Sequence, residues 1–218
     1  MLTLGSLEWK KVVATALKMS KPASGLGQSV EDVHLKTVQI IITRLGRVTC
    51  SPVRAAQRTW DWLMRAQLKS EGKPYDISAS KEMQGERWLR QGSMTCGLEL
   101  LPLPSPNINV WHYNRFSNDP ILRDRASYSA AMLPSRKAKI KAAIDEHRPR
   151  NVVFYSKRYL AHWQEIVGVG FDAVGDLHFA KSDDTSFFCT MHPTAQIKGA
   201  GRKKAYWENI GALLANAE

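Results

Sequence analysis

Cysteine is scarce in this sequence, and the few cysteines present are far apart. The 218 residues contain Cys50, Cys96 and Cys189, and no pair has the short spacing of a zinc or iron–sulfur site. Isolated cysteines are typical of small buried apolar side chains, and we assign all three this role. A glycine-rich phosphate loop is also absent. We therefore expect neither a metal nor another cofactor.

Long apolar runs are missing as well. No stretch reaches the length that crosses a bilayer, so we expect no contact with a membrane interior. Residues 1–21 are amphipathic and carry Lys10, Lys11 and Lys18, without the apolar centre of a signal peptide. A cytoplasmic protein is expected.

Acidic residues are the third shortage. Asp and Glu number 20 against 31 Lys and Arg, which gives a formal charge of +11 and an isoelectric point near 9.7. Such an excess favours polyanions, because each phosphate contact releases condensed counterions. A merely basic surface or an anionic membrane surface would carry the same charge, so basicity bears on partners and not on fold. DNA is the partner we expect.

An ordinary globular composition accompanies this charge, with 44% hydrophobic and 23% charged residues. We expect one domain over residues 1–218, acting as a monomer. Apolar and β-branched periodicities predict alternating strands and helices. The predicted strands are residues 36–43, 98–103 and 151–155, followed by a hairpin of residues 176–180 and 186–191. The predicted helices are residues 7–19, 53–68, 81–91, 127–147 with an interruption at Pro134, 158–166 and 203–216.

Strands separated by helices predict an α/β fold. We expect a three-layer sandwich with a central, mostly parallel four-stranded sheet flanked by helices. The working site of such a sheet lies beyond the carboxyl ends of its strands. This rule selects the loops that follow Thr43, Leu103, Tyr155 and Met191.

The loop after Met191 contains the most informative residues. His192 ends a buried strand and precedes Pro193, which restricts the backbone and aims the imidazole at the site. A neutral imidazole there can donate a hydrogen bond to a developing anion. The alternative is a histidine that only caps the strand end.

The sequence strand-His192-Pro193-Thr194 resembles the second signature of the uracil-DNA glycosylase superfamily. Residues 100–107 followed by Trp111, residues 148–155 and residues 206–211 are similar to segments of glycosylase-like members, in the same order. The resemblance runs from Leu98 to the C-terminus, a little over half of the chain. It implies an enzyme that flips a nucleotide out of DNA and cleaves its N-glycosidic bond.

The same resemblance implies roles for individual residues. His192 would stabilise the departing base anion, and Gln196 and Ile197 would press into the minor groove, where apolar side chains unstack base steps. The clustering of positive charge, apart from the resemblance, predicts that residues 135–150 and 198–204 build one basic face that binds phosphates. The residues assigned to DNA binding are Gln196, Ile197, Lys198, Arg202, Lys203, Lys204, Arg136 and Lys139.

The first signature of the family is altered. It normally supplies an Asp or Asn that positions the attacking water, but residues 43–52 contain neither. Ser51 or Thr43 would have to hold the water instead. Loops also supply four carboxylates that could act as the base, and these are Asp119, Asp124, Asp183 and Asp184. The Asn that reads uracil is also missing, and Asn107 is the nearest substitute.

These losses open the pocket where the C5 position of a pyrimidine points. We expect a bulky C5-substituted pyrimidine as the substrate, such as a glucosylated hydroxymethylcytosine, which the resemblance links to defence against phages. Alternatives are repair of uracil or damaged bases, a catalytically inactive member that binds nucleic acid, or an unrelated α/β nucleotide-binding or transferase protein. The residues assigned to base binding are Asn107, Asn109, Tyr113, Arg44 and Arg47.

Overall fold

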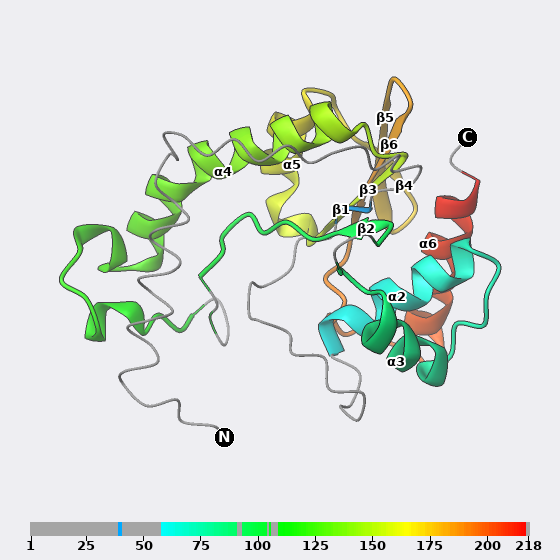
Figure 1. The fold of residues 1–218 in the computed structure, drawn as a ribbon. Coiled ribbons are helices and arrows are strands. Elements are labelled where there is room, and N and C mark those ends of the chain that lie inside the picture. The colour runs from blue at the N-terminus through cyan, green and yellow to red at the C-terminus, as the bar shows by residue number, and fades with distance from the viewer. Residues whose placement is uncertain (1–38, 41–57, 91–92, 104, 106–108, 217–218) are drawn as a thin grey trace.

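The structure is a computed structural model that describes residues 39–40, 58–90, 93–103, 105 and 109–216 (Figure 1). The predicted helix at residues 7–19 lies outside these residues, as does most of the predicted strand at 36–43. Within them the fold is α/β, with one sheet in the strand order β2-β1-β3-β6-β5-β4. The strands are β1 (Gln39–Ile40), β2 (Thr95–Cys96), β3 (Asn151–Tyr155), β4 (Asp172–Val174), β5 (Leu177–Ser182) and β6 (Thr185–Thr190).

The sheet is mixed, which corrects the expectation of a mostly parallel four-stranded sheet. β2, β1, β3 and β6 pair in parallel, and β5 and β4 continue the sheet in antiparallel pairing. The hairpin predicted across residues 182–184 is confirmed, and its turn contains Asp183 with a φ of 48°. Because tight turns reverse the chain between β4 and β5 and again between β5 and β6, each of these neighbouring pairs is antiparallel.

Alternate residues of β3 and β6 face opposite sides of the sheet. Val153 and Phe188 pack in one apolar cluster, whereas Val152, Phe154 and Phe187 pack in another. Both strands are buried on both faces, as their continuous apolar composition predicts. The helices divide between these two clusters.

The first cluster joins one face of the sheet to α2 (Arg58–Ser70), α3 (Ile77–Glu86) and α6 (Arg202–Ala215), which lie together on one side in Figure 1. Trp60, Leu63 and Met64 recur at helical spacing on the buried side of α2. At Gly211 of α6 the two helices approach so closely that an added Cβ would lie 2.7 Å from the carbonyl oxygen of Ala66. The absence of a side chain at residue 211 therefore sets the α2–α6 distance.

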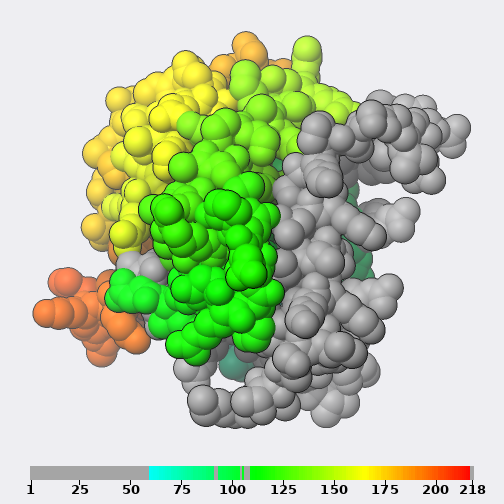
Figure 2. Space-filling view, turned by 90° about the vertical axis from the view of Figure 1, so that its left-hand side faces the viewer, coloured from blue at the N-terminus to red at the C-terminus, as the bar shows by residue number. Residues whose placement is uncertain are grey.

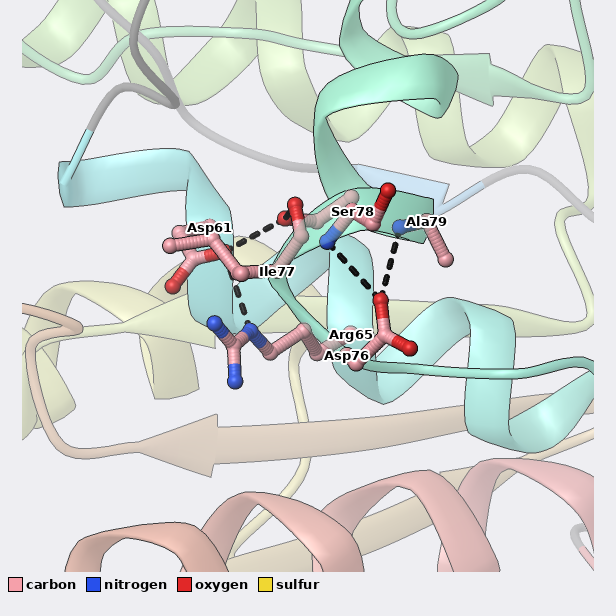
Figure 3. Close-up of polar contacts among 7 residues, drawn as sticks. Asp61, Arg65, Asp76, Ile77, Ser78 and Ala79 are labelled. Carbon is pink, nitrogen blue, oxygen red and sulfur yellow. Dashed lines mark hydrogen bonds and ion pairs between the residues drawn. The ribbon is translucent and has the colours of Figure 1, made fainter.

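Two aspartates stabilise α3, one by capping it and the other by joining it to α2 (Figure 3). Asp76 caps α3 by accepting the backbone N–H groups of Ser78 at 2.8 Å and Ala79 at 2.9 Å. Asp61 of α2 accepts the hydroxyl of Ser80 at 2.6 Å and the Nε–H of Arg65 at 2.9 Å. One carboxylate thus connects the two helices and holds an arginine at the same time.

The second cluster joins the other face of the sheet to α4 (Arg125–His147) and α5 (Leu160–Val167). α4 begins at the N-cap Asp124, whose carboxylate accepts the Ser127 N–H at 2.7 Å. That bond, aided by Arg123, lowers the pKa of Asp124 to about 2. The predicted interruption at Pro134 is wrong, because α4 continues through this residue. No helix among the residues that the structure describes is long and apolar enough to cross a membrane.

The strand predicted at residues 98–103 is also wrong. This segment is irregular, and the strand that enters the sheet is the shorter β2 just before it. Leu100 packs in the second cluster, while Leu103 packs in a third one with Tyr113, Leu122, Tyr128 and Met132. The apolar run is therefore buried, but it is buried as a connection between two clusters.

Candidate functional site

β3 and β6 are parallel neighbours that end side by side, at Tyr155 and Thr190. The next residue of the first strand, Ser156, has a φ of 102° and a ψ of 99°, a strained backbone for a residue other than glycine. Its N–H donates to the Thr190 carbonyl at 3.0 Å, and its carbonyl accepts the indole N–H of Trp163 at 3.2 Å. The backbone at this edge is held from both sides.

His192 follows β6 at the same edge and begins a β-turn. The N–H of Ala195 donates to the His192 carbonyl at 2.8 Å, with Pro193 at the second position, where proline favours turns. The imidazole Nδ1 accepts the Thr194 N–H at 3.2 Å and lies 2.7 Å from the Thr194 hydroxyl oxygen. Its ring meets that of Tyr155 edge-on, at 5.4 Å between centroids.

This contact favours one tautomer of the neutral ring. If Nδ1 accepts the backbone N–H, the proton of the neutral ring lies on Nε2. His192 is half-buried, and the contacts with Thr194 fix the Nδ1 side of its ring. A ring held in this way can donate a hydrogen bond to an anion.

A buried tyrosine of α6 supports the residue before His192. The Tyr206 hydroxyl accepts the Met191 N–H at 2.9 Å. Burial raises the pKa of Tyr206 to about 12, so the phenol stays protonated at neutral pH. The C-terminal helix therefore fixes the backbone that aims the histidine.

Between β6 and α6 the chain stands out from the side of the molecule, in orange in Figure 2. Gln196 and Lys198 are exposed on this loop, whereas Ile197 is half-buried and packs against the first cluster. The predicted wedge thus combines an outward polar side chain with an apolar one that partly anchors the loop.

The basic start of α6 follows the loop. Arg202 is exposed, and its side chain lies over Gly199, where an added Cβ would be 2.9 Å from the arginine Cδ. Lys203 is half-buried beside Trp62 of α2, and Lys204 is exposed with its Nζ 3.6 Å from Glu208. These predicted DNA-binding residues lie together at one end of α6.

The predicted base-binding residues of the aromatic loop are placed differently from one another. Tyr113 is only 2% exposed and packs against Trp111 at 4.8 Å between ring centroids. Asn109 is exposed, while Trp111 is half-buried and donates its indole N–H to the Leu122 carbonyl at 2.7 Å. The ring of Tyr113 supports this loop from inside.

Arg136 and Lys139 lie on α4, on the other side of the sheet from α6. Arg136 donates through Nε to the Glu99 carbonyl at 2.9 Å and through its Nη2 to the same oxygen, and burial lowers its pKa. Lys139 is exposed. Because α4 and α6 pack on opposite faces of the sheet, the two basic segments are separate surfaces, and the prediction of one basic face built from both is wrong.

The remaining predicted site residues lie outside the described part of the chain, and these are Thr43, Arg44, Arg47, Ser51 and Asn107. Of the other carboxylates considered, Asp119 and Asp124 are helix caps and Asp183 and Asp184 form the hairpin turn. Over the described residues, no three His, Cys, Asp or Glu side chains gather as metal ligands.

Two features were missed from the sequence. Glu99 is 6% exposed and is the one buried carboxylate of the described residues, beside Arg136 and Tyr128. Trp62 and Arg65 line a pocket together with residues of α6. An aromatic residue followed by an arginine three positions later on a helix is a signal for the second feature, since such side chains are neighbours.

Comparison with known proteins assigns the chain to no family. No protein-family model matches the chain, and no curated protein matches its sequence. The likeness to uracil-DNA glycosylases rests on the motifs of the sequence.

Proposed function

We propose that this protein is a DNA N-glycosylase that hydrolyses the N-glycosidic bond of a flipped, C5-substituted pyrimidine and leaves an abasic site. The observation that carries the proposal is the contact between the His192 imidazole and the Thr194 backbone. The imidazole Nδ1 accepts the Thr194 N–H at 3.2 Å, so the neutral ring presents a donor at Nε2. The histidine follows a buried strand at the carboxyl edge of parallel strands, which is where α/β proteins bind ligands.

The reaction requires only one hydrogen-bond donor from this side chain. Cleavage of the C1′–N bond sends the electron pair to the base, which becomes an anion, while the sugar becomes an oxocarbenium-like cation. Water adds to this cation, and the proton that the water loses passes through solvent to the base anion. An Nε2–H donor beside the base oxygen stabilises the anion without transferring its own proton. A donor aimed at developing charge is worth about 10²–10³ in rate.

The proposal also includes the substrate, the oligomeric state, the location and the residues of the base pocket. The substrate is duplex DNA, such as phage DNA with glucosylated hydroxymethylcytosine, and the protein acts as a monomer in the cytoplasm. Within a three-layer sandwich, the loops beyond the strand ends would form the base pocket. Thr43 or Ser51 would hold the water, while Arg44, Arg47, Asn107 and Asn109 would bind the C5 substituent.

Release of bases from a panel of DNAs tests this proposal. Duplexes that contain cytosine, uracil, hydroxymethylcytosine or glucosylated hydroxymethylcytosine are incubated in parallel, and abasic sites are measured by strand scission. We expect glucosylated hydroxymethylcytosine to be released fastest, because a site built for a polar substituent rejects bases that lack it.

The other results distinguish the alternatives. Equal or faster release of uracil would overturn the substrate assignment and leave a repair glycosylase. Release from no DNA, together with tight DNA binding, would overturn the enzymatic proposal and leave a binding protein of this fold.

A further inference from the structure

A small, shallow pocket lies between α2, the loop before α3, and α6. Its walls combine aromatic rings with charged side chains, a combination that suits nucleic acid. The pocket adjoins the basic start of α6, which follows the loop that carries His192. It is lined by Trp62, Arg65, Tyr75, Lys204, Trp207 and Glu208.

Contacts within α2 fix the orientation of the Arg65 guanidinium. Its Nε–H donates to Asp61 at 2.9 Å, and Asp61 is itself held by the Ser80 hydroxyl (Figure 3). The guanidinium carbon lies 4.7 Å from the centroid of the Trp62 ring. These contacts occupy Nε and one face of the group, and the side chain stays 17% exposed. The two terminal nitrogens form the fork that binds a phosphate in a bidentate manner.

Three lysines add positive charge around Arg65. The Nζ of Lys203 lies 5.9 Å from the Trp62 centroid, that of Lys69 lies 5.0 Å from the Tyr75 centroid, and the Lys204 side chain is 63% exposed. Four cations thus surround the pocket, against the two carboxylates of Asp61 and Glu208. The balance is positive on a surface that also offers aromatic rings.

Glu208 has a local role in this arrangement. It accepts the Tyr75 hydroxyl, which raises the pKa of that tyrosine, and it pairs with Lys204 at 3.6 Å. A single weak contact of this length leaves Lys204 able to turn towards a stronger anion. The carboxylate therefore keeps the lysine at the pocket and competes with a ligand for it.

We propose that this pocket binds a backbone phosphate of the DNA strand that carries the target base, with Arg65 and Lys204 as its ligands and Lys203 as a supporting charge. The proposal rests on the proposed function for its choice of DNA. Residues 198–204 connect the loop of His192 directly to the pocket, so DNA bound at His192 would reach the pocket along this segment. Charge and shape suit one or a few phosphates, so the contribution is to affinity and register and not to base choice.

Binding of a fluorescent 20-base-pair duplex of unmodified sequence tests the pocket. We expect Lys204→Gln and Arg65→Gln each to weaken binding about 3- to 10-fold at low salt. Each should also reduce the log–log salt slope by about one unit, as the loss of one phosphate contact does. Glu208→Gln should strengthen binding several-fold, because it removes the competing charge and keeps a hydrogen-bonding side chain. Lys81 is an exposed lysine of α3 that does not line the pocket, so Lys81→Gln is the matched control and should leave the affinity and the salt slope close to the parental values.

The outcomes separate this proposal from the proposed function. Salt slopes of Arg65→Gln and Lys204→Gln that equal the Lys81→Gln slope would overturn the pocket, even if the parental protein releases bases. Reduced slopes in a protein that releases no base would uphold the pocket and overturn the glycosylase. Thermal unfolding of each variant checks the fold. Should Arg65→Gln unfold, the variants at the exposed Lys204 and the half-buried Glu208 decide, since a loss of stability does not explain opposite effects on affinity.

Discussion

At the scale of single residues, the orientation of one imidazole carries the proposed chemistry. We predict that His192→Ala lowers the rate of base release about 10²- to 10³-fold, because it removes one donor aimed at a developing anion. Single-turnover release from glucosylated DNA measures this rate, and DNA affinity should change little. His147→Ala, an exposed histidine at the end of α4, is the control. Release by His192→Ala at the parental rate would reduce His192 to a strand cap.

The tyrosine behind that histidine gives a second prediction. Tyr206→Phe leaves the Met191 N–H without its acceptor and should lower the free energy of unfolding by about 1–3 kcal/mol. Urea denaturation measures the loss. Tyr159→Phe, in a half-buried turn before α5, is the control and should cost less. Equal costs for the two variants would show that the Tyr206 hydroxyl does not hold the strand end.

Tyr206 also predicts a dependence on alkaline pH. Burial raises its folded-state pKa to about 12, above the ordinary value of 10.0, so the folded protein holds this proton more tightly than the unfolded chain. The resulting stability is complete below pH 10 and is lost as pH rises towards 12. The parental protein should therefore lose stability between these values more steeply than Tyr206→Phe, as followed by chemical denaturation. Parallel curves would contradict this prediction.

At the scale of elements, the crossing of α2 and α6 depends on Gly211. A Cβ there would lie 2.6 Å from the Lys69 Cβ and 2.7 Å from the Ala66 carbonyl oxygen, and the backbone cannot move aside cheaply. We predict that Gly211→Ala destabilises the protein by about 1–3 kcal/mol, since overpacking outweighs the better helix propensity of alanine.

A second helical glycine is the matched control. An added Cβ at Gly85 of α3 meets nothing within 4 Å, so Gly85→Ala should be neutral or stabilise by up to about 1 kcal/mol. Thermal or urea unfolding compares the two variants. Similar effects of both would mean that helix propensity, and not packing, decides at residue 211.

Most helix positions followed from the sequence, but β2 and β4 were not predicted and the strand predicted at residues 98–103 is not formed. Apolar periodicity located α2, α4, α5 and α6 to within a few residues, because each buries one stripe against the sheet. Residues 98–103 have the composition of a buried strand, but Pro102 and the neighbouring proline cannot donate to a ladder, so burial occurs without pairing. Periodicity reports burial, and hydrogen bonding has to be inferred separately.

At the scale of the whole molecule, the net charge of +11 predicts strongly salt-dependent DNA binding. Affinity for duplex DNA should fall with a log–log slope of several units between about 50 and 200 mM salt, because several phosphates are neutralised. Fluorescence anisotropy at a series of salt concentrations measures the slope. Affinity that stays flat over this range would remove the electrostatic argument for a nucleic-acid partner.

The candidate site was only partly predictable from the chain. His192 and the basic residues near 202–204 stood out because they follow a recognisable strand and motif. The partnership of Trp62 and Arg65 with α6 did not, because it depends on how two helices distant in sequence cross. The sequence also does not show that Arg136 and Lys204 lie on opposite sides of the sheet, because the side that each helix covers is a tertiary property.

The strand order also has a consequence for the order of folding. β3, β4, β5 and β6 all lie within residues 151–190. Tight turns join β4 to β5 and β5 to β6, and β3 pairs with β6 across a connection that contains α5. β1 has to enter between β2 and β3, which come from much later in the chain. Because long-range pairing costs more loop entropy, the C-terminal half should form first and the N-terminal strand should dock last. In native-state hydrogen exchange, the amides of β3 and β6 should then be the slowest of the sheet, and those of β1 should open well before global unfolding.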